Sequence, residues 1–168
     1  LGDVDGDGAP DFAIGTSQKD EGRGAVLVWR NDGTGKSGSV LGLAIPPVSS
    51  GVEPAGFGSS LAASADFDGD GRSDVVVAAP FGPKTEGAAF VAVYAGAAGG
   101  PALGATRILS IGGAQRSGMR TYAGQDFDGD GFGDLVVWQH GELRGPGLHI
   151  FHGSAGGLPE KEIGRAHV

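Results

Sequence analysis

One nine-residue pattern occurs three times in this chain and constrains its fold more than any other feature. The pattern D-x-D-G-D-G-x-x-D spans residues 3–11, 66–74 and 126–134, so successive copies begin 63 and 60 residues apart. Each copy runs directly into a short apolar run, such as Val75-Val76-Val77-Ala78. Repetition with a period of this size indicates an array of similar structural units.

Each unit contains further apolar runs that we interpret as strands. A second run follows each motif, then a Gly-rich turn and a third run, and another run precedes the second and third motifs. The connections are too short and too rich in glycine for crossover helices, so the strands should be antiparallel. These runs lie at residues 25–29, 90–94 and 148–151, then at 39–45, 105–111 and 161–168, and before the motifs at 57–65 and 117–125.

The predicted fold class is therefore all-β, with four-stranded antiparallel units in tandem, as in the blades of a β-propeller. The expected blades are residues 1–47, which lack a first strand, and the complete units 48–113 and 114–168. Three blades in a row do not close a ring, and each blade needs a neighbour on both faces. We therefore expect the remaining blades in the parent chain, or association between chains.

The distribution of charge points to a bound cation in each motif. The formal net charge is −8, and twelve of the twenty acidic residues lie in the three motifs. The other eight acids are outnumbered by twelve Lys and Arg residues, so the body of the protein is slightly basic. Carboxylates gathered this closely repel one another unless a cation offsets their charge.

The spacing of the motif suits calcium. It sets carboxylates at loop positions 1, 3, 5 and 9 and a backbone carbonyl at position 7, and Ca²⁺ takes six to eight oxygens at about 2.3–2.6 Å. The glycines at positions 4 and 6 permit a sharp turn with positive φ. We predict three Ca²⁺ sites, with the ligands Asp3, Asp5, Asp7, the carbonyl of Ala9 and Asp11; Asp66, Asp68, Asp70, the carbonyl of Arg72 and Asp74; and Asp126, Asp128, Asp130, the carbonyl of Phe132 and Asp134.

Other interpretations of these loops fit the sequence less well. An EF-hand requires a bidentate Glu at position 12 and flanking helices, but position 12 holds Ile14, Val77 and Val137. Magnesium prefers a rigid octahedron that retains several waters, and an unmetallated polar turn would leave three four-Asp clusters without a purpose. Catalytic carboxylates are disfavoured because a filled cage leaves no position for substrate.

Other metal chemistry has little support. The chain has no Cys, which excludes thiolate sites and a disulfide framework. His149 and His152 are three residues apart, so on one strand they would point to opposite faces and would not share a metal.

The chain resembles the FG-GAP repeats that form the β-propeller of integrin α subunits and their bacterial relatives. The second unit carries Phe57-Gly58, the Asp motif, Ala78-Ala79-Pro80 where the family has Gly-Ala-Pro, then Gly87-Ala88 and Val93-Tyr94. The other two units depart from this pattern, with Tyr122-Ala123-Gly124 and Trp138-Gln139-His140 in the third and only Ile14-Gly15-Thr16 in the first.

The resemblance implies a seven-bladed propeller in the complete protein, with Ca²⁺ stiffening the first hairpin of each blade. Ligands would then bind the opposite face, through loops at residues 17–23, 47–56, 81–86 and 140–145. The function we expect is a non-enzymatic, extracellular or cell-surface module for adhesion to a protein or glycan, because extracellular calcium fills even modest sites. We expect no nucleic-acid partner and, without an apolar stretch of 18 residues, no membrane insertion.

Two other functions are compatible with the repeat pattern. The chain could be a non-catalytic accessory domain of a larger secreted enzyme, such as a hydrolase, lyase or phospholipase. It could also be an enzyme itself, but no nucleophile paired with a base is visible in the sequence, and we expect no catalytic residues.

Overall fold

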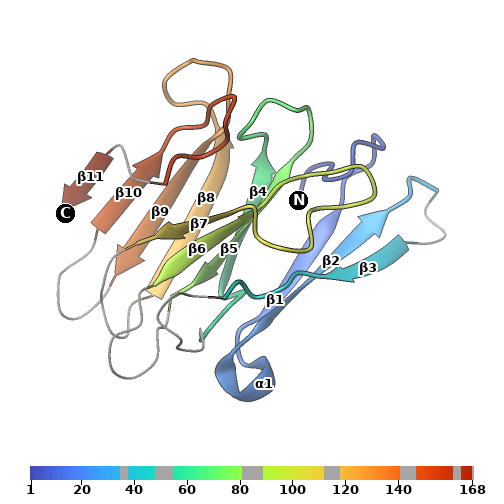
Figure 1. The fold of residues 1–168 in the computed structure, drawn as a ribbon, viewed down its shortest axis with the longest axis horizontal. Coiled ribbons are helices and arrows are strands. Elements are labelled where there is room, and N and C mark those ends of the chain that lie inside the picture. Colours follow the sequence, from blue (N-terminus) through green and yellow to red (C-terminus); the bar gives the residue numbers. More distant parts are fainter. Residues whose placement is uncertain are drawn as a thin grey trace.

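A computed structural model describes residues 1–34, 38–47, 55–80, 89–111, 118–140, 147–160 and 164–167. Over these residues the chain forms eleven strands and one short helix, arranged as three antiparallel sheets (Figure 1). The predicted all-β class and antiparallel pairing are confirmed. Within the described residues, no helix has the length and apolar character needed to cross a bilayer.

In each sheet the strands pair in the order in which they occur along the chain. The first sheet consists of β1 (Phe12–Thr16), β2 (Ala25–Asn31) and β3 (Gly38–Gly42). The second consists of β4 (Ser60–Ala65), β5 (Asp74–Ala79), β6 (Phe90–Tyr94) and β7 (Arg107–Ser110). The third consists of β8 (Gly118–Gln125), β9 (Asp134–His140), β10 (Gly147–Phe151) and β11 (Gly164–His167).

One sheet therefore has three strands and the other two have four. The helix α1 (Lys19–Gly22) lies between β1 and β2 and was not predicted. In Figure 1 the second sheet lies between the first, drawn in blue, and the third, drawn in orange and red. The chain therefore shows the arrangement of consecutive propeller blades.

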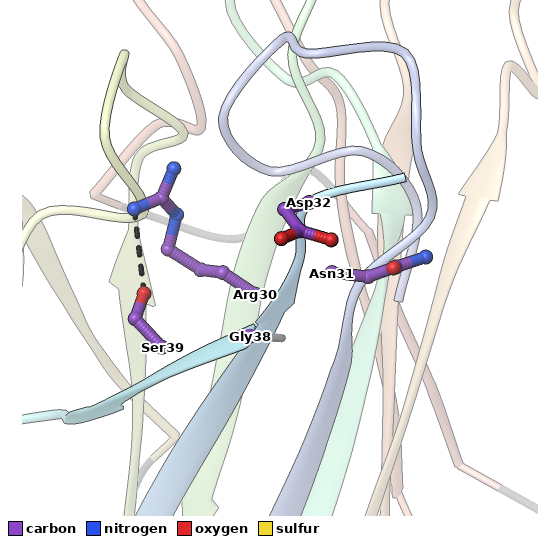
Figure 2. Close-up of a pocket in the computed structure, with 5 residues that line it drawn as sticks. All are labelled: Arg30, Asn31, Asp32, Gly38 and Ser39. Carbon is purple, nitrogen blue, oxygen red and sulfur yellow. Dashed lines mark hydrogen bonds between the residues drawn. The ribbon is translucent and has the colours of Figure 1, made fainter. Parts of the chain in front are cut away.

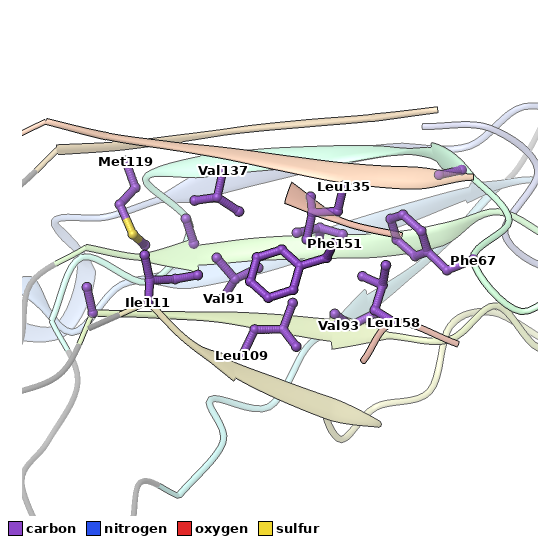
Figure 3. Packing of buried hydrophobic residues seen from close by; sticks show 14 residues of the cluster. Phe67, Val91, Val93, Leu109, Ile111, Met119, Leu135, Val137, Phe151 and Leu158 are labelled. Carbon is purple, nitrogen blue, oxygen red and sulfur yellow. The ribbon is translucent and has the colours of Figure 1, made fainter. Parts of the chain in front are cut away.

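Strand β5 explains why the middle sheet is the centre of the structure. All six of its residues are buried, because alternate side chains point to opposite faces of a strand and both faces are covered. Val75, Val77 and Ala79 pack toward the first sheet, in a core with Val26, Val28, Phe57 and Tyr94. Val76 and Ala78 pack toward the third sheet, in a core with Phe67, Leu109, Leu135 and Phe151 (Figure 3).

Among the described residues, the first sheet is covered on one face only. Val26 and Val28 of β2 are buried, whereas their neighbours Leu27 and Trp29 are 42% and 39% exposed. The indole of Trp29 stacks on the ring of Phe12, with centroids 5.9 Å apart. The apolar run that suggested a buried strand is therefore buried on alternate residues.

A bulge precedes the second and third Asp loops. The register of β4 shifts between Ala62 and Ala65, and that of β8 shifts between Ala123 and Gln125. Ser64 and Gly124 have positive φ values of 73° and 106° at these points. Bulges bend a strand and increase its twist, so both loops leave their sheets with the same local geometry.

Candidate metal centre

The three Asp loops occupy equivalent places in the three sheets. They lead into β1, β5 and β9, and the second and third loops close the hairpins β4–β5 and β8–β9. In Figure 1 they lie along the same upper edge of the structure. Position 12 of each loop falls inside a strand, at Ile14, Val77 and Val137, which excludes an EF-hand as predicted.

The glycines at positions 4 and 6 give the loops their curvature. Gly69 and Gly71 have φ values of 78° and 85°, and the corresponding glycines of the other two loops range from 77° to 95°. Backbone conformations of this kind are readily adopted only by glycine. The predicted requirement for positive φ is confirmed at all six positions.

The first carboxylate of each loop organises the backbone around it. Asp3 accepts hydrogen bonds from the N–H groups of Gly6 (2.7 Å) and Gly8 (2.8 Å), and a weaker one from Asp7 (3.2 Å). Asp66 and Asp126 repeat the same three contacts in their own loops. The loops are therefore curled around position 1 by their own hydrogen bonds.

In the first and third loops these donors also change the acidity of the first carboxylate. The Gly131 N–H donor is the largest influence on Asp126, and with Gly129 and Asp130 it lowers the pKa of that carboxyl. For Asp3, partial burial acts to raise the pKa, but the hydrogen bonds from Gly8, Gly6 and Asp7 together outweigh it and lower the pKa. Both groups are held in the anionic form that binds a metal.

The last carboxylate of each loop ties the loop to the next hairpin. Asp74 is 3% exposed and accepts the N–H of Phe67 (3.0 Å) in its own loop and that of Gly96 (2.9 Å) beyond β6. Asp11 and Asp134 make the matching pairs of contacts, to Val4 and Asn31 and to Phe127 and Gly153. Burial raises the pKa of Asp74 to about 6, although these donors act in the opposite direction.

The third position is where the loops differ. In the first loop, Asp5 forms an ion pair with Arg30: Nε of Arg30 lies 2.6 Å from Asp5 Oδ2, and Nη2 also contacts that oxygen. In the third loop, Asp128 is contacted by His152, whose Nδ1 lies 2.8 Å from Asp128 Oδ2 and 3.4 Å from Asp134 Oδ2. This Nδ1 is buried and has no hydrogen-bond partner of suitable geometry.

In the second loop, burial raises the pKa of Asp68, and the charges of Asp70 and Asp66 raise it further. The fifth position, Asp7, Asp70 or Asp130, accepts the N–H of the position-7 residue at 2.8–3.0 Å. Asp70 also forms an exposed ion pair with Arg72, 3.0 Å apart.

Carboxylate oxygens converge in all three loops. Oxygens of Asp3, Asp5 and Asp11, of Asp66, Asp68 and Asp70, and of Asp126, Asp128 and Asp130 lie within 4.8 Å of one another in each group. Two oxygens bound to one Ca²⁺ are separated by at most about 5 Å, so these groups fit a single ion. Asp7 and Asp74 lie outside these groups, whereas Asp134 joins Asp128 and His152 in a fourth.

Sequence reasoning missed two side chains at these loops. Arg30 lies near the end of β2 and His152 directly follows β10, so each comes from a strand that does not directly follow the loop it contacts. The two side chains share one feature in the sequence that could have identified them. Each immediately precedes the residue whose N–H donates to the carboxylate at loop position 9, which is Asn31 in the first sheet and Gly153 in the third. His149, on the other hand, is buried within β10 and lies outside the metal-ligand groups.

Comparisons with known proteins agree with the repeat pattern. A family model described as an FG-GAP-like repeat matches residues 3–77, and a second, described as an FG-GAP repeat, matches residues 57–105. The chain is 37% identical to integrin alpha-5 of Xenopus laevis over 108 residues. That match covers 59% of this chain and 10% of the relative, so the chain spans about a tenth of that protein's length.

Proposed function

Because the chain belongs to the FG-GAP repeat family, we propose that it is part of an extracellular, non-enzymatic binding module stabilised by three Ca²⁺ ions. The observation that carries this proposal is the convergence of carboxylate oxygens in three loops at one edge of the sheets. We propose as ligands the residues predicted from the motif, including the carbonyls of Ala9, Arg72 and Phe132. We also keep the blade boundaries at residues 47/48 and 113/114 as a proposal.

The choice of calcium rests on the ligand chemistry. The loops offer oxygen atoms from flexible carboxylates, which suits the larger and less regular coordination of Ca²⁺ better than the octahedron of Mg²⁺. When bound, the ion would neutralise the repulsion between these carboxylates. The residues at position 9 would transmit this stabilisation to the sheets, since Asp74 joins its loop to the chain beyond β6.

The edge opposite the Asp loops is the surface that we propose for ligand recognition. Of the loops expected there, residues 48–54, 81–86 and 141–145 lie outside the described residues. The remaining loop contains α1, in which Asp20 and Glu21 have positive φ values of 51° and 59°. Such values are uncommon in residues other than glycine and are associated with functional sites, which supports a protein or glycan contact there.

Thermal unfolding tests the calcium proposal. A ligand at a hundred times its dissociation constant adds about 2.7 kcal/mol per site, and 1 kcal/mol shifts the Tm of a domain of this size by about 2–4 °C. Three filled sites should therefore raise the Tm by at least about 10 °C over the value in EGTA. Calorimetric scans in CaCl₂, MgCl₂ and EGTA would measure this shift.

The matched control replaces the first carboxylate of each loop, Asp3, Asp66 and Asp126, with Asn. These substitutions keep the size and an acceptor oxygen but remove a charge from every loop. We expect the triple variant to lose most of the rise caused by Ca²⁺. Equal Tm values in CaCl₂ and EGTA for the unmodified protein would contradict the proposal.

A further inference from the structure

The three loops are alike in sequence but differ in the side chain that approaches them from the neighbouring strand. The N–H groups of Asn31, Gly96 and Gly153 all donate to the position-9 carboxylate of their own sheet, at 2.8–2.9 Å. These three residues are therefore structurally equivalent. The residues immediately before them, Arg30, Ala95 and His152, occupy one equivalent position.

Arg30 brings a permanent positive charge into the first loop. Its Nε and Nη2 both contact Asp5 Oδ2, and the Asp5 side chain is only 1% exposed. A guanidinium stays protonated at all relevant pH values and binds carboxylates through a rigid set of donors. Figure 2 shows the same guanidinium close to Ser39, to which Nη1 donates at 3.4 Å, beside a pocket of about 290 Å³.

The second loop lacks this interaction and has space in its place. Ala95 has no charged group, and together with Asp68 and Asp74 it lines a cavity of about 210 Å³. Arg107 also lines this cavity, but its Nη2 donates to the carbonyl of Gly156 at 3.1 Å. The basic partner within the second loop, Arg72, pairs with Asp70 where both side chains are about one-third exposed, so solvent screens that pair.

We propose that Arg30 acts as a built-in cation of the first loop and makes it the weakest of the three calcium sites. This inference rests on the proposed calcium function. An incoming Ca²⁺ must displace the guanidinium from Asp5 or bind beside a positive charge, and both weaken binding. The second loop, with Ala95, carries no such competitor from this position. In the third loop, His152 Nδ1 lies with oxygens of Asp128 and Asp134 in a group that could itself hold a metal ion, so this side chain adds a metal-binding nitrogen where Arg30 adds only donors.

Calcium titration of the complete chain by isothermal titration calorimetry tests the inference. After removal of metal with a chelator, the protein should bind two ions tightly and a third at least about tenfold more weakly, as expected for competition with a charged hydrogen bond. Asp3→Asn should remove only the weak class. Asp66→Asn should remove one tight site.

One substitution removes the competing guanidinium from the first loop, and a second introduces one beside the second loop. Arg30→Ala should strengthen the weak class at least about tenfold, and Ala95→Arg, which places a guanidinium beside the 210 Å³ cavity, should weaken one tight site. Arg120→Ala is the matched control, since it removes an exposed arginine from β8 and should leave all three affinities unchanged. Arg30→Lys keeps the charge but not the rigid donors, and should give an intermediate affinity even if the alanine variant fails to fold.

The outcomes separate this inference from the function on which it rests. Three equal sites in the unmodified protein, or affinities unaffected by both Arg30→Lys and Ala95→Arg, would overturn the role of Arg30 while calcium binding stands. If neither the unmodified chain nor any variant bound calcium, the proposed function itself would fall, and the inference with it.

Discussion

At the scale of single residues, the loops divide their tasks by position. The first carboxylate, as in Asp3, is held by backbone N–H groups near the surface. The ninth, as in Asp74, is buried and joins the loop to the following hairpin. Asp3 and Asp74, which occupy the first and ninth positions of their loops, therefore differ in acidity because their surroundings differ.

Asp74 gives the metal-free protein a specific dependence on pH. Its pKa is raised from 3.8 to about 6 by burial, so between these values the folded protein retains a proton that the unfolded chain has released. Its contribution to stability is therefore largest at low pH and declines as the pH rises through this window, by up to about 3 kcal/mol.

Urea unfolding in EGTA at pH values from 4 to 7, for the unmodified protein and for Asp74→Asn, measures this effect. The amide does not titrate, so the stability of the unmodified protein should decline relative to the variant across the window. The variant loses an acceptor for one N–H group, which shifts its stability by a similar amount at every pH. If the free energies of unfolding of the two proteins differed by the same amount at every pH, the proposed titration of Asp74 would be contradicted.

At the scale of strands, the contribution of each side chain to the free energy of unfolding depends on whether one or both faces of its strand are buried. Val77 of β5 is fully buried between sheets, whereas Val40 of β3 is 51% exposed. Removal of two methyl groups from a packed core costs about 2 kcal/mol, but surface changes are usually within about 0.5 kcal/mol.

We therefore expect Val77→Ala to lower the free energy of unfolding by about 2 kcal/mol and Val40→Ala to change it by less than about 0.5 kcal/mol. Both substitutions remove the same atoms, so the β-propensity of the residue type is matched. Urea titrations in saturating CaCl₂ would measure the difference. Equal losses for the two variants would contradict the placement of β5 between two covered faces.

The sequence located the strands well where apolar residues form continuous runs. The run at residues 75–78 lies within β5, and 90–94 coincides with β6. The run predicted at 39–45 ends early, because the N–H of Ala44 bonds to the carbonyl of Leu103 rather than to β2. The run predicted from residue 57 starts as a strand only at Ser60, because Phe57 instead forms an isolated parallel bridge with Gly24, the residue before β2.

The candidate site was predictable only in part. The spacing of aspartates along one segment indicates that the loop wraps a cation, and the oxygens of each loop do converge. Arg30 and His152 could not be found in this way, since they reach the loops through the register of strands distant in sequence. Only the pairing of β2 with β1, and of β10 with β9, places them.

At the scale of the whole molecule, the sheets and the loops depend on each other. Two apolar cores hold the three sheets in a row, and that arrangement places the three Asp loops at one edge (Figure 1). Most of the acidic charge is gathered there, whereas the rest of the chain carries more Lys and Arg than acids. Three Ca²⁺ ions would change the formal net charge from −8 to −2.

The number of calcium ions bound per chain tests the central claim most directly. Equilibrium dialysis of the complete chain against radioactive ⁴⁵Ca²⁺, with excess Mg²⁺ present to suppress weak surface binding, counts them. We predict saturation at three ions per chain, and one fewer for each loop in which the first aspartate is replaced by Asn. Saturation at zero, or a number that these replacements leave unchanged, would contradict the assignment of the loops as calcium sites.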